Sequence, residues 1–146
     1  MIKTLFLGFS FFTVSVLAGP LLVSQEEMNA SNNASPPFTA KAVSVKDAPM
    51  IELKTPKLST PVSSPTVIEL KFEPTPPSSV KPDSFKVLYG SFEIDITKRI
   101  LNVAKVTETG VFVPEANLPK GKHKLLMVVE DTAGRKGNRS IDFEVK

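Results

Sequence analysis

Apolar and polar residues alternate along most of the chain from Met50 onward, which is the period of a β-strand that buries one face. In residues 66–72, TVIELKF, the apolar side chains of Ile68, Leu70 and Phe72 fall on one face and polar side chains dominate the other. The same alternation occurs in residues 50–56, 84–90, 91–97, 99–106, 110–114 and 140–145, although the register of 99–106 is ambiguous. The pattern therefore predicts seven or eight short strands, most of them half buried.

Residues 123–131, HKLLMVVED, form a different kind of strand, because the run from Leu125 to Val129 is apolar on both faces. A strand without a polar face is typical of a position that is covered from both sides. We therefore expect this segment to be a central strand of a sheet.

Proline and glycine residues separate these windows, as expected for turns. The link Tyr89-Gly90-Ser91 predicts a tight hairpin, because glycine adopts a positive φ without steric cost. No window of ten or more residues has the apolar spacing of an amphipathic helix. Short strands at this spacing predict an all-β fold, an antiparallel Greek-key β-sandwich of about seven strands over residues 50–146.

Residues 1–18 have the pattern of a secretory signal peptide, with one lysine, an apolar run over residues 5–17 and a small residue, Ala18, at the cleavage position. Cleavage after Ala18 would give a periplasmic or secreted protein without a stable membrane span. The alternative is an uncleaved anchor. A spanning helix needs about 20 apolar residues, and the run breaks at Gly19 and Pro20.

The segment that follows is polar on average. Residues 24–49 are rich in Ser, Asn, Ala, Pro and Lys, and such a composition buries too little apolar surface to offset the entropy lost on ordering. We therefore expect a disordered, flexible tether over residues 19–49, whose removal would leave the thermal unfolding of the domain nearly unchanged. Val43 and Val45 alternate, so a short edge strand there stays open as an alternative.

The amino-acid composition excludes several kinds of site and one class of partner. The chain has no cysteine, which excludes disulfides, thiolate metal sites, cysteine nucleophiles and the lipid-attachment cysteine of a bacterial lipoprotein. The signal segment contains one lysine and no acid, so its removal lowers the formal charge from +3 to +2. This charge is too small to predict a nucleic-acid partner.

Two stretches together resemble bacterial immunoglobulin-like domains. IELKTPKLSTPVSSPTVIELKF, residues 51–72, has a strand, a proline-bounded turn and a second strand introduced by Ser-Pro. LPKGKHKLLMVVEDTAGRKGNRSIDFEV, residues 118–145, resembles the closing hairpin of that family. The matching positions are Leu118, Pro119, Gly121, His123, Asp131, Ala133, Gly134, Phe143 and Val145. Arg135 stands where the family commonly has Asn. The resemblance covers residues 50–146 and implies an immunoglobulin-like sandwich, but such domains serve as spacers, adhesin repeats, accessory modules and partner-binding modules.

A weaker resemblance links SSPTVIELKFEPTPP, SFKV, LPKGKHKL and FEV to the periplasmic copper-binding β-barrel of copper resistance. That family binds copper through an N-terminal histidine and a histidine close to the final hairpin. The processed chain here would begin with Gly19, and the bend carries Asp131-Thr132-Ala133 without a histidine. The ligands of that family are therefore missing from these positions, and we expect neither a metal nor another cofactor.

His123 is the only histidine in the chain. Copper and zinc sites of ordinary strength need two or more nitrogen or sulfur ligands. No Ser, Asp or Glu is placed in the sequence as an obvious catalytic partner, and no G-x-S-x-G, P-loop or H-E-x-x-H motif occurs. We therefore expect His123 to open its strand and pack near the turn, in a protein that is not an enzyme.

Three acidic residues need a separate interpretation. Asp95, Glu130 and Asp131 could contribute oxygen ligands to calcium, but the sequence has no Asp-x-Asp-x-Asp-Gly loop. The favoured alternative is that Asp131 accepts hydrogen bonds from the backbone of its own turn, as aspartate commonly does.

Six cations flank the final hairpin, at Lys120, Lys122, Lys124, Arg135, Lys136 and Arg139. If the two strands pair, these cations divide between the two ends of the hairpin. The group at the bend could contact an anionic partner. It could also keep a solvated hairpin from pairing at its edge. The candidate partner-contact residues are Asp131, Arg135, Lys136, Asn138 and Arg139.

Together these features predict an exported, non-enzymatic binding or accessory module of the bacterial cell envelope. Its expected partner is an envelope protein or an anionic glycan. A periplasmic copper carrier is the main alternative, and a small hydrolase is a third class.

Overall fold

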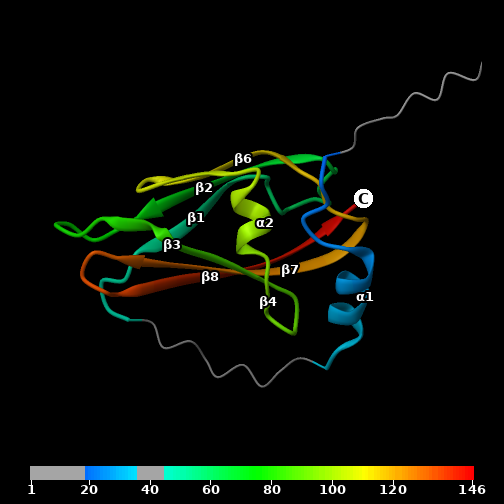
Figure 1. Ribbon diagram of the computed structural model, residues 1–146, viewed down its shortest axis with the longest axis horizontal. Coiled ribbons are helices and arrows are strands. Elements are labelled where there is room, and N and C mark those ends of the chain that lie inside the picture. The colour runs from blue at the N-terminus through cyan, green and yellow to red at the C-terminus, as the bar shows by residue number, and fades with distance from the viewer. Residues whose placement is uncertain (1–18, 36–44) are drawn as a thin grey trace, which may run out of the picture.

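The computed structural model describes residues 19–35 and 45–146 (Figure 1). The predicted signal peptide lies outside the described residues, and so do residues 36–44, which hold the middle of the predicted tether.

Eight strands and two short helices make up the described chain. They are α1 (Gln25–Asn33), β1 (Met50–Thr55), β2 (Thr66–Glu73), β3 (Val80–Tyr89), β4 (Ile94–Asp95), α2 (Thr97–Leu101), β5 (Lys105–Thr107), β6 (Gly110–Ala116), β7 (Gly121–Asp131) and β8 (Lys136–Val145). The strands form two four-stranded antiparallel sheets, in the orders β1-β2-β6-β5 and β4-β3-β7-β8. The predicted all-β sandwich is confirmed, with eight strands where about seven were expected, and it is compatible with an immunoglobulin-like domain.

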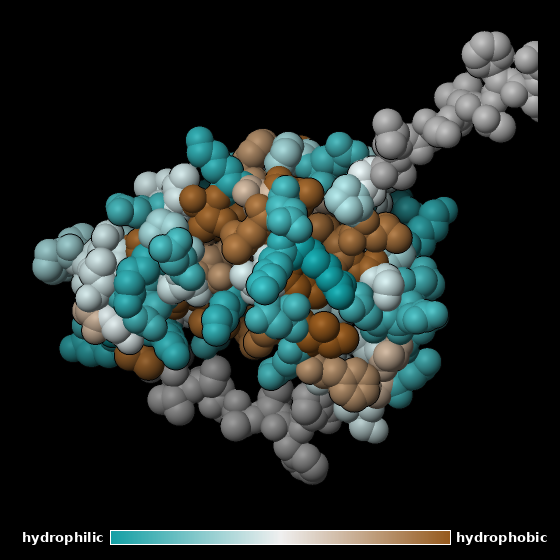
Figure 2. Space-filling view, viewed as in Figure 1, coloured by the Kyte–Doolittle hydropathy of each residue, from teal (hydrophilic) through white to brown (hydrophobic). Residues whose placement is uncertain are grey.

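The core lies between the two sheets and follows the predicted alternation. Leu70 and Phe72 on β2 face Phe85 and Val87 on β3, and all four side chains are at most 4% exposed. The rings of Phe72 and Phe85 pack with their centroids 5.9 Å apart. Each such side chain contributes roughly 1.5–3 kcal/mol through the removal of apolar surface from water. In the view of Figure 2, hydrophilic residues cover much of the surface and apolar residues are seen between them.

The apolar strand at residues 123–131 is central, as predicted, because β7 lies between β3 and β8. Met127 and Val129 point into the core and are 2% and 0% exposed. Leu126 and Val128, on the outer face, are half buried.

The prediction of two strands over residues 91–106 is wrong in part. Phe92 is 63% exposed, and only Ile94 and Asp95 are in strand β4. The chain then turns into helix α2, because Ile96 and Ile100 are four residues apart and a single helical turn directs both into the core. Alternation seen in the sequence cannot distinguish this arrangement from a strand when the window is so short.

The link after Tyr89 is a four-residue loop over residues 90–93, wider than the tight link that the sequence predicts. Gly90 has a φ of 71°, which is the positive value expected of it, and it accepts a hydrogen bond from the Glu93 N–H over 3.2 Å.

The segment before β1 corrects the prediction of a disordered tether for residues 19–35. Leu22, Val23 and Met28 are 2%, 0% and 4% exposed and belong to the core. The Leu22 N–H donates to the Asn117 carbonyl over 3.0 Å, which attaches this segment to the end of β6. The apolar residues of this segment are few but close together, so the average composition of the segment does not reveal that they can be buried.

Helix α1 is held by polar contacts as well. Ser24 and Glu27 form a reciprocal capping box at its N-terminus. The Arg99 guanidinium donates two hydrogen bonds, of 2.7 and 2.8 Å, to the Glu27 carboxylate. These bonds from Arg99, with the Ser24 backbone hydrogen bond, lower the pKa of Glu27 to about 2. The helix is therefore fixed to α2 by a charge-assisted pair.

Of the helices in residues 19–35 and 45–146, none is long and apolar enough to cross a membrane.

Candidate functional site

The turn between β7 and β8 is organised by one buried carboxylate. Asp131 is 0% exposed. Its Oδ1 accepts hydrogen bonds from the N–H groups of Ala133 and Arg135, over 3.0 and 2.9 Å, and its Oδ2 accepts one from Arg135 Nε over 2.8 Å. The expectation that Asp131 binds the backbone of its own turn is confirmed, and the side chain of Arg135 joins it there.

The charge of Asp131 is stabilised where it lies. Burial acts to raise the pKa of this carboxyl, but the hydrogen bonds from Arg135 and Ala133 and the charge of Arg135 outweigh burial, so that the pKa lies below its ordinary value. Arg135 also donates to Ser78 Oγ over 3.1 Å, and the Thr132 N–H donates to the Ser79 carbonyl over 2.8 Å. The turn is thereby tied to the loop that precedes β3.

Replacing Asp131 by Asn is expected to lower the melting temperature by about 5–10 °C, because the amide loses the charge and turns an NH2 group toward Arg135. Thermal unfolding followed by circular dichroism measures this change. Asp142→Asn is the matched control, since Asp142 lies exposed on β8. Equal melting temperatures for the two variants would show that the turn does not depend on Asp131.

Arg139 lies at the edge of the second sheet and contacts the first sheet. Its guanidinium Nη1 donates to the Ile51 carbonyl over 3.1 Å, so it joins the edge of β8 to the edge of β1. It shares the face of β8 that carries Ile141 and Val145, which point inward. An inward-directed charge on an edge strand discourages pairing with another chain.

The five candidate contact residues therefore do not form a single cluster. Asp131 and Arg135 bind each other within the turn, and Arg139 bridges two strand edges. Lys136 and Asn138 are exposed on the outer face of β8.

Strand register adds two lysines from β3 to this outer face. Lys81 is opposite Glu130, which is opposite Lys136, and Lys86 is opposite Val128, which is opposite Asn138. We call Lys81, Lys86, Lys136 and Asn138 the hairpin patch. Lys81 forms an ion pair with Glu130, and Lys136 is opposite the same glutamate on β8. Lys81 and Lys86 were not among the predicted contact residues, because strand pairing and not proximity along the chain brings them to this face.

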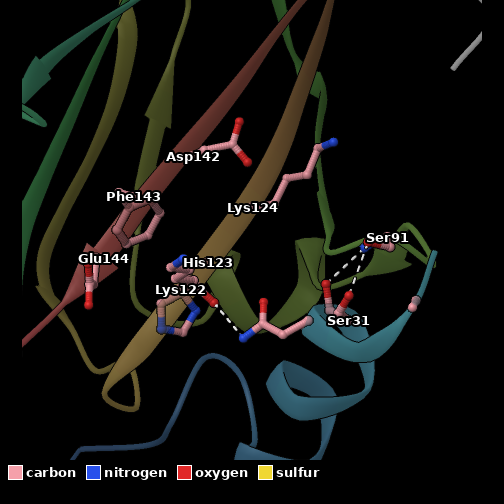
Figure 3. Close-up of a pocket in the computed structure, with 10 residues that line it drawn as sticks. Ser31, Ser91, Lys122, His123, Lys124, Asp142, Phe143 and Glu144 are labelled. Atoms are coloured by element: carbon pink, nitrogen blue, oxygen red, sulfur yellow. Dashed lines mark hydrogen bonds between the residues drawn. The ribbon is translucent and has the colours of Figure 1, made fainter. Parts of the chain in front are cut away.

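The remaining cations lie at the other end of the hairpin, as the sequence analysis expected. Lys122 is opposite Glu144 and Lys124 is opposite Asp142. These four side chains line an open groove of about 490 Å³ between α1 and the β7–β8 pair (Figure 3). Two lysines and two acidic residues line it, so the groove has no excess of positive or negative charge.

Ser31 fixes α1 beside this groove. Its Oγ accepts a hydrogen bond from the Ser91 N–H over 2.9 Å, and its carbonyl accepts one from Ser91 Oγ over 3.1 Å (Figure 3).

His123 also lines this groove, although it is only 3% exposed. Its Nε2 lies 2.7 Å from the Pro119 carbonyl, which only accepts, so Nε2 carries the proton. Nδ1 then accepts from the Tyr89 hydroxyl over 2.9 Å. The ring stacks on Phe143, with centroids 5.4 Å apart. Both nitrogens are occupied by protein groups, which confirms that His123 packs near the turn.

Burial sets the protonation of this pair of rings. Burial lowers the pKa of His123, although the hydrogen bond to Pro119 acts in the opposite direction. Burial also raises the pKa of Tyr89 to about 12, with a smaller contribution from the charge of Glu27. At neutral pH, His123 is therefore a neutral acceptor and Tyr89 its donor.

The acidic residues considered for calcium do not converge. Asp95 accepts a hydrogen bond from the Thr97 N–H over 2.9 Å at the start of α2, and Glu130 pairs with Lys81. Across the two described ranges, no three His, Cys, Asp or Glu side chains are grouped as metal ligands.

Comparison with protein-family models and curated proteins assigns no function to these residues. No protein-family model matches the chain, and no curated protein matches it at a significant level.

Proposed function

We propose that the chain is an exported, non-enzymatic binding or accessory module of the bacterial cell envelope, and that the hairpin patch is its contact with an acidic glycan. The observation that carries this proposal is the register that puts Lys81, Lys86 and Lys136 together on the outer face of one sheet. Exposed lysines attract an anionic polymer and accelerate its encounter, an effect that salt weakens.

The rigidity of the adjacent turn supports the same proposal. Asp131 holds the turn through three hydrogen bonds, and Arg135 and Thr132 tie it to the neighbouring loop. A surface that is already ordered loses less conformational entropy on binding.

The position of the patch in the molecule also favours contact. The β7–β8 turn is at one end of the sandwich, and α1 and the C-terminus are at the other (Figure 1). Residues 19–23 therefore join the domain at the end remote from the β7–β8 turn. If the N-terminal end of the chain were held at a surface, the hairpin patch would stay accessible.

Titration with polygalacturonic acid at low salt tests the proposal. The double variant Lys81→Glu with Lys136→Glu is expected to bind at least about tenfold more weakly than the wild type, since each replacement reverses a charge. The matched control is Lys122→Glu with Lys124→Glu, which makes the same change at the other end of the sheet. Its affinity should stay within about twofold of the wild-type value.

Three results would contradict the proposal. Equal losses of affinity in both double variants would show that the polymer is attracted by the overall charge of the protein alone. Binding that persists at high salt would exclude an electrostatic contact. Binding to an acidic peptide but not to the polyuronate would make the partner a protein.

A further inference from the structure

The end of β6 receives the chain just beyond the predicted cleavage position. Leu21 forms a parallel bridge with Asn117, and the Leu22 N–H donates to the Asn117 carbonyl over 3.0 Å. Leu22 and Val23 then enter the core. Only Gly19 and Pro20 separate this attachment from Ala18.

Gly19 lies against two polar side chains at this end. A Cβ atom on Gly19 would be 2.8 Å from Asn117 Nδ2 and 3.9 Å from Glu115 Oε1. Glycine therefore fits beside Asn117 without displacing its side chain. The Glu115 side chain is exposed, and its Oε1 is the carboxylate oxygen near the position that a Cβ on Gly19 would take.

We propose that a signal peptidase hydrolyses the Ala18–Gly19 peptide bond, and that the α-ammonium group released on Gly19 pairs with the carboxylate of Glu115. Water adds across the bond, so the Ala18 carbonyl carbon becomes a carboxylate and the Gly19 nitrogen becomes an amine that takes up a proton at neutral pH. Before the cut, the same nitrogen is an uncharged amide. The ion pair is therefore a property of the processed protein alone, and it joins the new N-terminus to β6.

This inference rests on the export that the proposed function includes. It is independent of the hairpin patch, which lies on β3 and β8, in the other sheet from β6.

The position of the cut is tested by producing the full chain with its own leader in a bacterial host. The intact mass of the protein recovered from the cell envelope should correspond to residues 19–146. A product that begins at another residue, or that keeps the leader, overturns the proposal.

The ion pair is tested on the processed product. The α-amino group is labelled by reductive methylation with ¹³C-formaldehyde, and its pKa is read from the methyl resonance as the pH is changed. Glu115→Gln is expected to lower this pKa by about 0.5 unit, the size of an exposed ion pair. Glu108→Gln removes the same charge near the other end of β6, about 20 Å away, and should leave the pKa unchanged.

The outcomes separate the two proposals. Equal pKa values in the wild type and Glu115→Gln, with the expected mass, overturn the ion pair and leave export intact. A retained leader overturns export as well. Loss of polyuronate binding alone affects only the hairpin patch.

Discussion

Deletion of residues 19–35 from the processed chain is expected to lower the melting temperature by about 15–20 °C. Leu22, Val23 and Met28 are at most 4% exposed, and each contributes roughly 1.5–3 kcal/mol of burial. The deletion also removes Glu27 and leaves Arg99 without its partner. Calorimetry or circular dichroism measures the shift, and an unchanged melting temperature would restore the view of this segment as a tether.

Two neighbouring leucines provide a matched pair of point variants. Leu22→Ala is expected to reduce the free energy of unfolding by about 3 kcal/mol, because Leu22 is 2% exposed and its removal leaves a cavity. Leu21 is 59% exposed, so Leu21→Ala should change that free energy by less than about 0.5 kcal/mol. A loss below about 0.5 kcal/mol in Leu22→Ala as well would show that the segment does not contribute through this side chain.

The sequence predicts the inner faces of the sandwich well, because the alternation of apolar and polar residues is visible within each strand by itself. Leu70, Phe72, Phe85, Val87 and Tyr89 all point inward as expected. The central position of β7 was also predictable, because the run from Leu125 to Val129 is apolar on both faces, although the outer face is only half buried.

The errors occur where the outcome depends on contacts distant in sequence. Leu22 and Val23 are ordered by the end of β6, which follows them by more than 85 residues. Ile96 and Ile100 fit a strand or a helical turn equally well until the core surrounds them. In both cases tertiary packing decides what local composition cannot.

The candidate site divides in the same way. The turn function of Asp131 was predictable, because aspartate binds its own backbone by local geometry. The addition of Lys81 and Lys86 to the hairpin patch depends on the register between β3 and β7. The inward direction of Arg139 was available in the sequence, since it shares the parity of Ile141, Phe143 and Val145.

Replacement of His123 by Ala is expected to reduce the free energy of unfolding at pH 7 by about 3 kcal/mol. The change removes a buried ring that stacks on Phe143 and leaves the Tyr89 hydroxyl and the Pro119 carbonyl without their partner. Tyr89→Phe removes only the hydroxyl, so a smaller loss of about 1–2 kcal/mol is expected. Urea denaturation at pH 7 measures both.

His123→Ala should also abolish the dependence of the free energy of unfolding on pH between pH 7 and 5. The pKa of His123 is lowered in the folded protein, so below pH 6.5 the unfolded chain binds a proton more readily than the folded chain does. The stability that the neutral ring contributes is therefore complete above about pH 6.5 and is lost as the pH falls through the folded pKa. His123 is the only histidine, and carboxylates titrate mainly below about pH 5, so this window isolates one group. Wild type and Tyr89→Phe should both lose stability across it, whereas His123→Ala should not. A wild-type protein whose stability is constant from pH 7 to 5 would show that the buried ring accepts a proton without cost.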